Sequence, residues 1–227
     1  MNATTLNPQT PSLSLGMSIQ QQVDDSISDL LASLPDPKKL SAEQRRGIIA
    51  RYSAVLEGNF IYWMTGALLS VRSEQARSII LDNLHEEVRD SHPEMLRRFT
   101  LAAHAFPTDS DAMAVHRDLT KVRLFVGRLS TVQLVIMMGF FEGFIQKFMS
   151  FLAYLAGDQG SAEREYTDVH GVCDIAHTEG LFRALDSEIS LNPPDPEANL
   201  FEGVELLSSL IRSIVQQTAT NNGCKPI

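Results

Sequence analysis

The amino-acid sequence predicts an all-α protein, a single-domain bundle of seven to eight helices. Apolar residues recur at the spacing of amphipathic helices over long segments, and no run of alternating β-branched residues marks a strand. Segments rich in proline, glycine and small polar residues separate the helical segments, as turns and helix caps require. Apolar residues make up 44% of the 227 residues, which is enough to build one packed core.

Each expected helix is bounded by residues that start or stop helices. Ser18 can cap the first helix, and prolines end it. Ser41 and Gln44 form a capping box for the second helix, and Ser73 begins the third, which Pro93 interrupts. Turns rich in glycine, proline and polar residues precede or follow the remaining helices. The expected helical ranges are 18–34, 41–71, 73–104, 111–129, 131–156, 161–189 and 197–217.

One domain is expected to span residues 18–219, because no internal repeat or linker divides the helical pattern. Residues 1–17 are rich in Thr, Ser, Asn and Pro and carry no charge, so we expect a disordered N-terminal tail. Residues 220–227 are expected to form a short C-terminal tail.

Composition excludes several classes of partner and location. A net charge of −9 argues against a nucleic-acid partner, which would require a basic surface. Two cysteines are too few for a disulfide framework and are typical of a reducing cytoplasm. A targeting signal would require positively charged residues near its start, but no Lys or Arg precedes Lys38. The apolar run from Leu134 to Phe141 is too short to span a membrane. We therefore expect a cytoplasmic protein with no membrane partner.

The segment 170–177 contains the most regular group of candidate metal ligands. His170, Asp174 and His177 lie at positions i, i+4 and i+7 of one expected helix. At about 100° per residue, their side chains fall within roughly 60° of one another on the helix surface. Imidazole nitrogen and carboxylate oxygen together suit iron, manganese or zinc. The pattern indicates three ligands of a metal site, with a chance cluster on a solvated face as the alternative.

Two glutamates lie inside strongly apolar helical segments, each next to a glycine. Glu142 directly follows a run of apolar residues, and Glu57 precedes a segment rich in aromatic residues. Burying an unpaired carboxylate is energetically costly, so each must be paired, protonated or bound to a metal. A metal ion is the expected partner, and a salt bridge to a buried arginine or lysine is the alternative.

The segment 83–93 contains many further candidate ligands. Glu87 and His92 are five residues apart, roughly 140° round a regular helix, so a continuous helix cannot direct both at one metal. A bulge or unwinding just before Pro93 would bring them together, and such breaks often occur at functional sites. Asp82 and His85, at i and i+3, are the alternative pair on an unbroken helix.

Together these positions provide four carboxylates and three histidines, about the set that a dinuclear non-haem iron site between bundle helices requires. A structural zinc site would need only four ligands, usually with cysteine among them. Cys173 points about 100° away from the histidine stripe and is interpreted as a packing residue. The expected metal ligands are Glu57, Glu87, His92, Glu142, His170, Asp174 and His177.

Over roughly residues 45–185 this pattern resembles the heme-oxygenase-like diiron oxidases and oxygenases. That family has a glutamate on its first core helix, a glutamate and a histidine on its second, a further glutamate, and a late His-x3-Asp-x2-His. The sequence motif Asn-Leu-x-x-Glu … His-Pro-Glu-x-Leu is most similar to that of the small single-domain group that includes the chlamydial death-domain-associating protein. The spacing between the glutamate and histidine of the second helix varies in the family, so Glu86 stays open as an alternative to Glu87.

The resemblance implies the heme-oxygenase fold without haem, two iron ions as cofactor and O2 as co-substrate, often through a peroxo-diferric state. It implies an enzyme that oxidises a small organic substrate, such as an amino acid, an amine or a fatty acid, by N-oxygenation, desaturation or oxidative C–C cleavage. An external electron donor, a homodimer and manganese in place of one iron are left open. Residues that could contact the substrate, unless they serve packing or solvation, are Phe141, Met138 and Lys147.

Two other classes of function stay open. In a ferritin-like diiron carboxylate enzyme, Asp82-x-x-His85 and Asp174-x-x-His177 would replace the usual Glu-x-x-His pairs. A metal-free binding or interaction module on the same fold would use none of these residues as ligands. His85 and His92 separate the first alternative from the heme-oxygenase-like reading, which requires that His92 matter more for iron binding. The second alternative predicts no metal after purification and no loss of function when His170 or His177 is changed.

Overall fold

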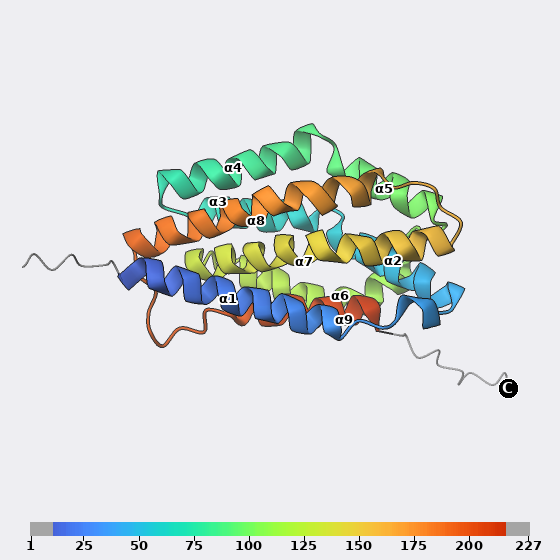
Figure 1. The fold of residues 1–227 in the computed structure, drawn as a ribbon, viewed down its shortest axis with the longest axis horizontal. Helices are drawn as coiled ribbons and strands as arrows, with labels where there is room; N and C mark the ends of the chain where they lie inside the picture. The colour runs from blue at the N-terminus through green and yellow to red at the C-terminus, as the bar shows by residue number, and fades with distance from the viewer. Residues whose placement is uncertain (1–10, 217–227) are drawn as a thin grey trace, which may run out of the picture.

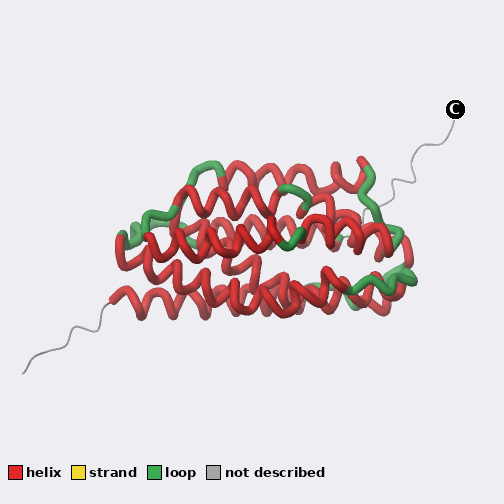
Figure 2. Tube along the Cα trace, turned by 90° about the horizontal axis from the view of Figure 1, so that it is seen from above, coloured by secondary structure: helices red, strands yellow, loops and turns green. Residues whose placement is uncertain are grey.

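The computed structural model describes residues 11–216, which form an all-α body without a strand (Figures 1 and 2). This confirms the predicted all-α class. The predictions for residues 1–10 and 217–227 concern parts of the chain outside the described residues. The helices are α1 (Pro11–Ala32), α2 (Ala42–Leu56), α3 (Asn59–Ser70), α4 (Glu74–Arg89), α5 (His92–Ala102), α6 (Asp109–Val126), α7 (Thr131–Asp158), α8 (Glu165–Leu191) and α9 (Glu202–Val215), with a short 3-10 helix at Pro37–Lys39.

Several helix starts differ from the prediction. α2 follows the predicted capping box, and both reciprocal hydrogen bonds of Ser41 and Gln44 are present. α1 begins at Pro11 instead of Ser18, so residues 11–17, expected in a disordered tail, are helical. α8 and α9 begin four and five residues later than predicted. Polar side chains at 161, 163, 195 and 199 accept hydrogen bonds from backbone N–H groups two residues further on, which favours turns over helix.

The helix predicted over 41–71 is interrupted after residue 56. Gly58 has a φ of 76°, a left-handed conformation that glycine adopts without a steric penalty. The side-chain amide of Asn59 donates a hydrogen bond to the Val55 carbonyl across the break. α2 and α3 are therefore two helices, and Glu57 lies at the corner between them instead of inside one helix.

The helix predicted over 73–104 is interrupted where the prediction expected it. α4 ends at Arg89, and α5 begins at His92 after Ser91, whose φ is 59°. Pro93 lies in the first turn of α5, where backbone N–H groups have no partner within the helix, so the N–H that proline lacks costs no hydrogen bond. Because of the break, side chains at the end of α4 and the start of α5 can point towards each other, which one continuous helix would not allow.

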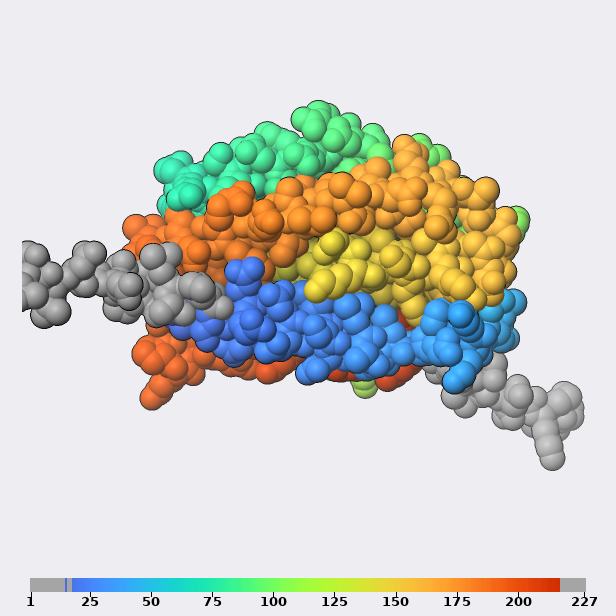
Figure 3. All heavy atoms as spheres, viewed as in Figure 1, coloured from blue at the N-terminus to red at the C-terminus, as the bar shows by residue number. Residues whose placement is uncertain are grey.

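α7 is the central helix of the bundle. Residues 134–145 are buried around its whole circumference, with α1, α2, α3, α8 and α9 packed against the helix. In Figure 3, α7 is visible on the surface only as a strip between α1 and α8. By length and composition α7 could cross a membrane, but 78% of its most apolar window is buried inside the bundle. Core packing accounts for that composition.

Candidate metal centre

The motif on α8 directs three potential ligands into the bundle. His170, Asp174 and His177 are all buried, and Asp174 is 0% exposed. Their neighbours Val172 and Ile175, at other positions round the helix, are 71% and 47% exposed. The predicted stripe of three ligands is therefore the inward face of α8, and the alternative of a solvated face is wrong.

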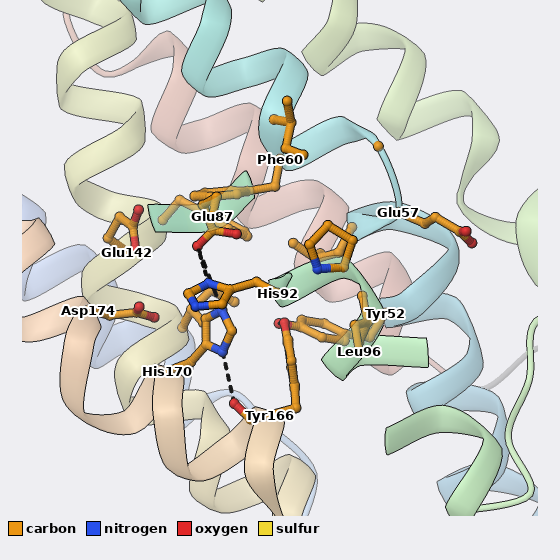
Figure 4. A pocket seen from close by; sticks show the side chains of 16 residues that line it. Tyr52, Glu57, Phe60, Glu87, His92, Leu96, Glu142, Tyr166, His170 and Asp174 are labelled. Carbon is orange, nitrogen blue, oxygen red and sulfur yellow. Dashed lines mark hydrogen bonds and ion pairs between the residues drawn. The ribbon is translucent and has the colours of Figure 1, made fainter. Parts of the chain in front are cut away.

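Glu87, His92 and His170 form the first group of potential ligands, with candidate ligand atoms within 4.8 Å of one another. His92 Nδ1 lies 2.7 Å from Glu87 Oε1, a hydrogen bond between residues on either side of the α4–α5 break. His170 Nε2 lies 3.8 Å from the same oxygen, and the two imidazole rings lie with centroids 4.6 Å apart. The predicted break thus brings Glu87 and His92 together, and Figure 4 shows both facing His170.

The tautomer of His170 follows from its surroundings. Its Nδ1 lies 2.8 Å from the backbone oxygen of Tyr166, which can only accept a hydrogen bond, so Nδ1 carries the proton. Burial lowers the pKa of His170 to about 4, so the ring is neutral at pH 7. Its Nε2 therefore presents a lone pair to Glu87 and His92, as a metal ligand must.

Glu142, Asp174 and His177 form the second group, deeper between α7 and α8. His177 Nδ1 lies 3.8 Å from Glu142 Oε2 and 3.8 Å from Asp174 Oδ1, too far for hydrogen bonds. Glu142 Oε1, Asp174 Oδ2 and His177 Nδ1 are buried and have no hydrogen-bond partner within residues 11–216. On the other side of the ring, His177 Nε2 lies 2.9 Å from the half-exposed Glu86.

The second group concentrates acidic charge in a dry environment. Burial, reinforced by the nearby charge of Glu142, raises the pKa of Asp174 to about 9. Burial likewise raises the pKa of Glu142. Burial alone would lower the pKa of His177, but the carboxylates of Glu142 and Glu86 raise it to about 10. Without a metal, these groups must hold protons that a bound cation would replace.

Glu86 and Glu87 occupy different positions, a choice that the sequence leaves open. Glu87 is buried in the first group, whereas Glu86 contacts His177 from the outside. A carboxylate that hydrogen-bonds the far nitrogen of a histidine is the usual device for orienting a metal-binding imidazole.

Glu57 does not join the other six predicted ligands. Its side chain is 40% exposed, and Glu57 Oε1 accepts a hydrogen bond from Arg97 Nε at 2.9 Å. Figure 4 shows its carboxylate pointing away from the histidines. The expectation of a buried glutamate within a helix is therefore wrong at this position, because the Gly58 corner turns the residue towards solvent.

The remaining candidate residues lie outside the two ligand groups or away from the cavity. Asp82 and His85 are both exposed on α4, so the alternative ligand pair does not face the bundle. Cys173, interpreted from the sequence as a packing residue, is half-buried, and its thiol donates a hydrogen bond to Asp174 Oδ1 over 3.2 Å. Lys147 is exposed, and Met138 is buried away from the cavity described next.

A cavity with an empty volume of about 480 Å³, including its open mouth, adjoins both groups. Phe141 lines it together with other apolar side chains from α2, α3, α5 and α7, and its contact with a substrate stays a prediction. A buried pair that no sequence motif indicates, Tyr52 and Tyr166, also lines it, with hydroxyl oxygens 2.7 Å apart. Burial raises the pKa of both tyrosines, which keeps them protonated. Tyr166 precedes His170 by four residues and so lies on the same face of the helix, which is the one sequence feature that indicates its place beside the ligands.

Comparisons of the chain with models of known protein families, with curated proteins and with solved structures found no match.

Proposed function

We propose that this protein is an O2-activating non-haem diiron oxidase or oxygenase that acts on a small organic substrate. The observation that carries the proposal is a set of three buried atoms that no described residue pairs with, Glu142 Oε1, Asp174 Oδ2 and His177 Nδ1. Buried polar atoms are normally hydrogen-bonded, and a bound metal ion would satisfy all three at once. The adjoining group of Glu87, His92 and His170 offers ligands for a second ion.

The ligand types favour iron. Two neighbouring groups of imidazole nitrogen and carboxylate oxygen, contributed by facing helices, are typical of dinuclear non-haem sites. When bound, two Fe(II) ions would supply electrons for the reduction of O2. Any further electrons would come from an external donor.

The chain's own residues would orient the ligands and exclude water. The Tyr166 carbonyl fixes the His170 ring, and Glu86 holds the far nitrogen of His177. The cavity beside them has mainly apolar walls, including Phe60, Leu96 and Phe141. Such walls favour a substrate with an apolar body, and an amino acid, an amine or a fatty acid meets that condition.

The test is anaerobic titration of the metal-free full-length protein with Fe(II), followed by exposure to O2. We expect about two iron ions per chain, because each group offers three ligands, and a transient visible absorption after mixing with O2. Glu57→Gln should also bind about two, because this carboxylate lies outside both groups.

Two results would contradict the proposal. One is binding of no iron, or of a single ion unaffected by His177→Ala. The other is full iron loading with no O2 consumption, alone or with amino acids, amines and fatty acids. A loss of iron in Glu57→Gln would instead return Glu57 to the ligand set and require α2 and α3 to move when metal binds.

A further inference from the structure

The buried charges of the proposed centre do not balance. The two groups contain three carboxylates, Glu87, Glu142 and Asp174, and the three histidines bind metal as neutral ligands. Two divalent ions would bring four positive charges, leaving one in excess in a buried site. A buried unpaired charge is strongly unfavourable, so a further anionic ligand, either a side chain or a metal-bound hydroxide from solvent, would balance the site.

Cys173 lies where such a ligand is needed. Its Sγ, an oxygen of Asp174 and a nitrogen of His177 lie within 4.8 Å of one another. Sγ is 3.2 Å from Asp174 Oδ1. Two ligand atoms bound to one ion at about 2.1 and 2.3 Å, at right angles, lie about 3.1 Å apart, so this separation suits shared coordination.

The same place holds independent evidence for a ligand. Asp174 and His177 are at least nine-tenths buried, and in the described part of the chain Asp174 Oδ2 and His177 Nδ1 have no hydrogen-bond partner. The only partner of the Cys173 thiol among the described residues is Asp174 itself. A cation placed between these atoms would contact sulfur, oxygen and nitrogen together.

We propose that the Cys173 thiolate is a ligand of the metal ion held by Glu142, Asp174 and His177. The thiol gives up its proton to solvent as the metal–sulfur bond forms, and the thiolate supplies the fourth negative charge. The inference rests on the proposed function only in requiring a metal at this position. It makes the two positions chemically different: nitrogen and oxygen ligands at one, a softer set with sulfur at the other.

Cobalt(II) binding to the full-length protein tests this assignment, because a cobalt–thiolate bond gives a near-ultraviolet charge-transfer absorption that oxygen and nitrogen ligands do not. The wild-type protein should show this band as the metal binds. Cys173→Ser should lack it and bind one of two cobalt ions at least about tenfold more weakly. The matched control is Cys224→Ser, which removes the only other cysteine and should keep the band.

Glu86 is the rival source of the fourth charge, because it contacts His177 from the half-exposed side. Glu86→Gln should keep the thiolate band. Occupancy of both cobalt positions without the band, a band that persists in Cys173→Ser, or weaker cobalt binding in Glu86→Gln but not in Cys173→Ser would overturn the assignment. Each of these results would contradict the cysteine ligand and leave the diiron proposal unchanged. A thiolate band in a protein whose iron-loaded form does not react with O2 would contradict only the proposed function.

Discussion

At the scale of single residues, Glu57 and Glu142 show how similar local sequences lead to different environments. Both are glutamates followed by glycine in an apolar segment. Glu142 lies within a continuous helix and is 3% exposed, facing His177. Glu57 ends its helix, and its carboxylate pairs with Arg97 in a setting where ion pairs contribute little to stability. The two glutamates differ because α7 continues past Glu142 whereas α2 ends just before Glu57, and neither local sequence pattern encodes this difference.

The two histidines of the 83–93 segment give a prediction at this scale. His92→Ala should lower iron binding from about two ions to about one per chain, because His92 belongs to the first ligand group. His85→Ala is the matched control and should change nothing, because His85 is exposed. Iron analysis after anaerobic loading checks both variants, and the reverse order of effects would favour the ferritin-like alternative.

At the scale of elements, the α4–α5 break determines the geometry of the first ligand group. Glu87 and His92 would point about 140° apart on a regular helix, yet their side chains are hydrogen-bonded at 2.7 Å. Ser91 makes this possible with a left-handed backbone, and its side chain makes no capping hydrogen bond there. The residue is therefore in a strained conformation that glycine would adopt more easily.

Substitution at the two helix breaks tests this interpretation in opposite directions. Ser91→Gly should stabilise the protein by up to about 1 kcal/mol, because it removes left-handed strain, and raise the Tm by about 2–4 °C. Gly58→Ala should lower the Tm by a similar amount, because no atom of the described residues lies within 4 Å of the added Cβ and only backbone strain acts. Thermal melts of the metal-free protein measure both, and shifts of the same sign would contradict the argument.

At the scale of the whole molecule, the bundle holds titratable groups in its interior, and its stability should depend on pH. The folded-state pKa values of Asp174 (about 9) and His177 (about 10) exceed their usual values of 3.8 and 6.5. Their stabilising contributions are therefore lost as pH rises through the folded values. His170, lowered to about 4, acts oppositely, but only between about pH 4 and 6.5.

The metal-free protein should therefore lose thermal stability between about pH 7 and pH 10. Asp174→Asn should reduce the decline, because the amide does not titrate. Metal loading should also reduce it, since bound ions replace the protons on the ligands. Melting curves with and without metal over this range test the prediction, and a metal-free protein whose Tm rises with pH above 7 would refute the electrostatic description of the second group.

Much of the architecture is contained in local sequence. Apolar periodicity and caps such as the Ser41–Gln44 box determine the all-α class and most helix positions, because helices depend on contacts within a few residues. The His170–Asp174–His177 stripe was predictable for the same reason: helical geometry alone places three side chains on one face. Pro93 likewise marked the break that unites Glu87 with His92.

Contacts between distant segments were decided only by the tertiary structure. The packing of α4 against α8 sends Glu87 to the ligand groups and leaves Glu86 on the outer side of His177. The Gly58 corner removes Glu57 from the site, and the meeting of α2 with α8 joins Tyr52 to Tyr166 across 114 residues. Local sequence determines which face of a helix is buried, but which groups meet there depends on how separate helices pack, and that packing is a property of the whole core.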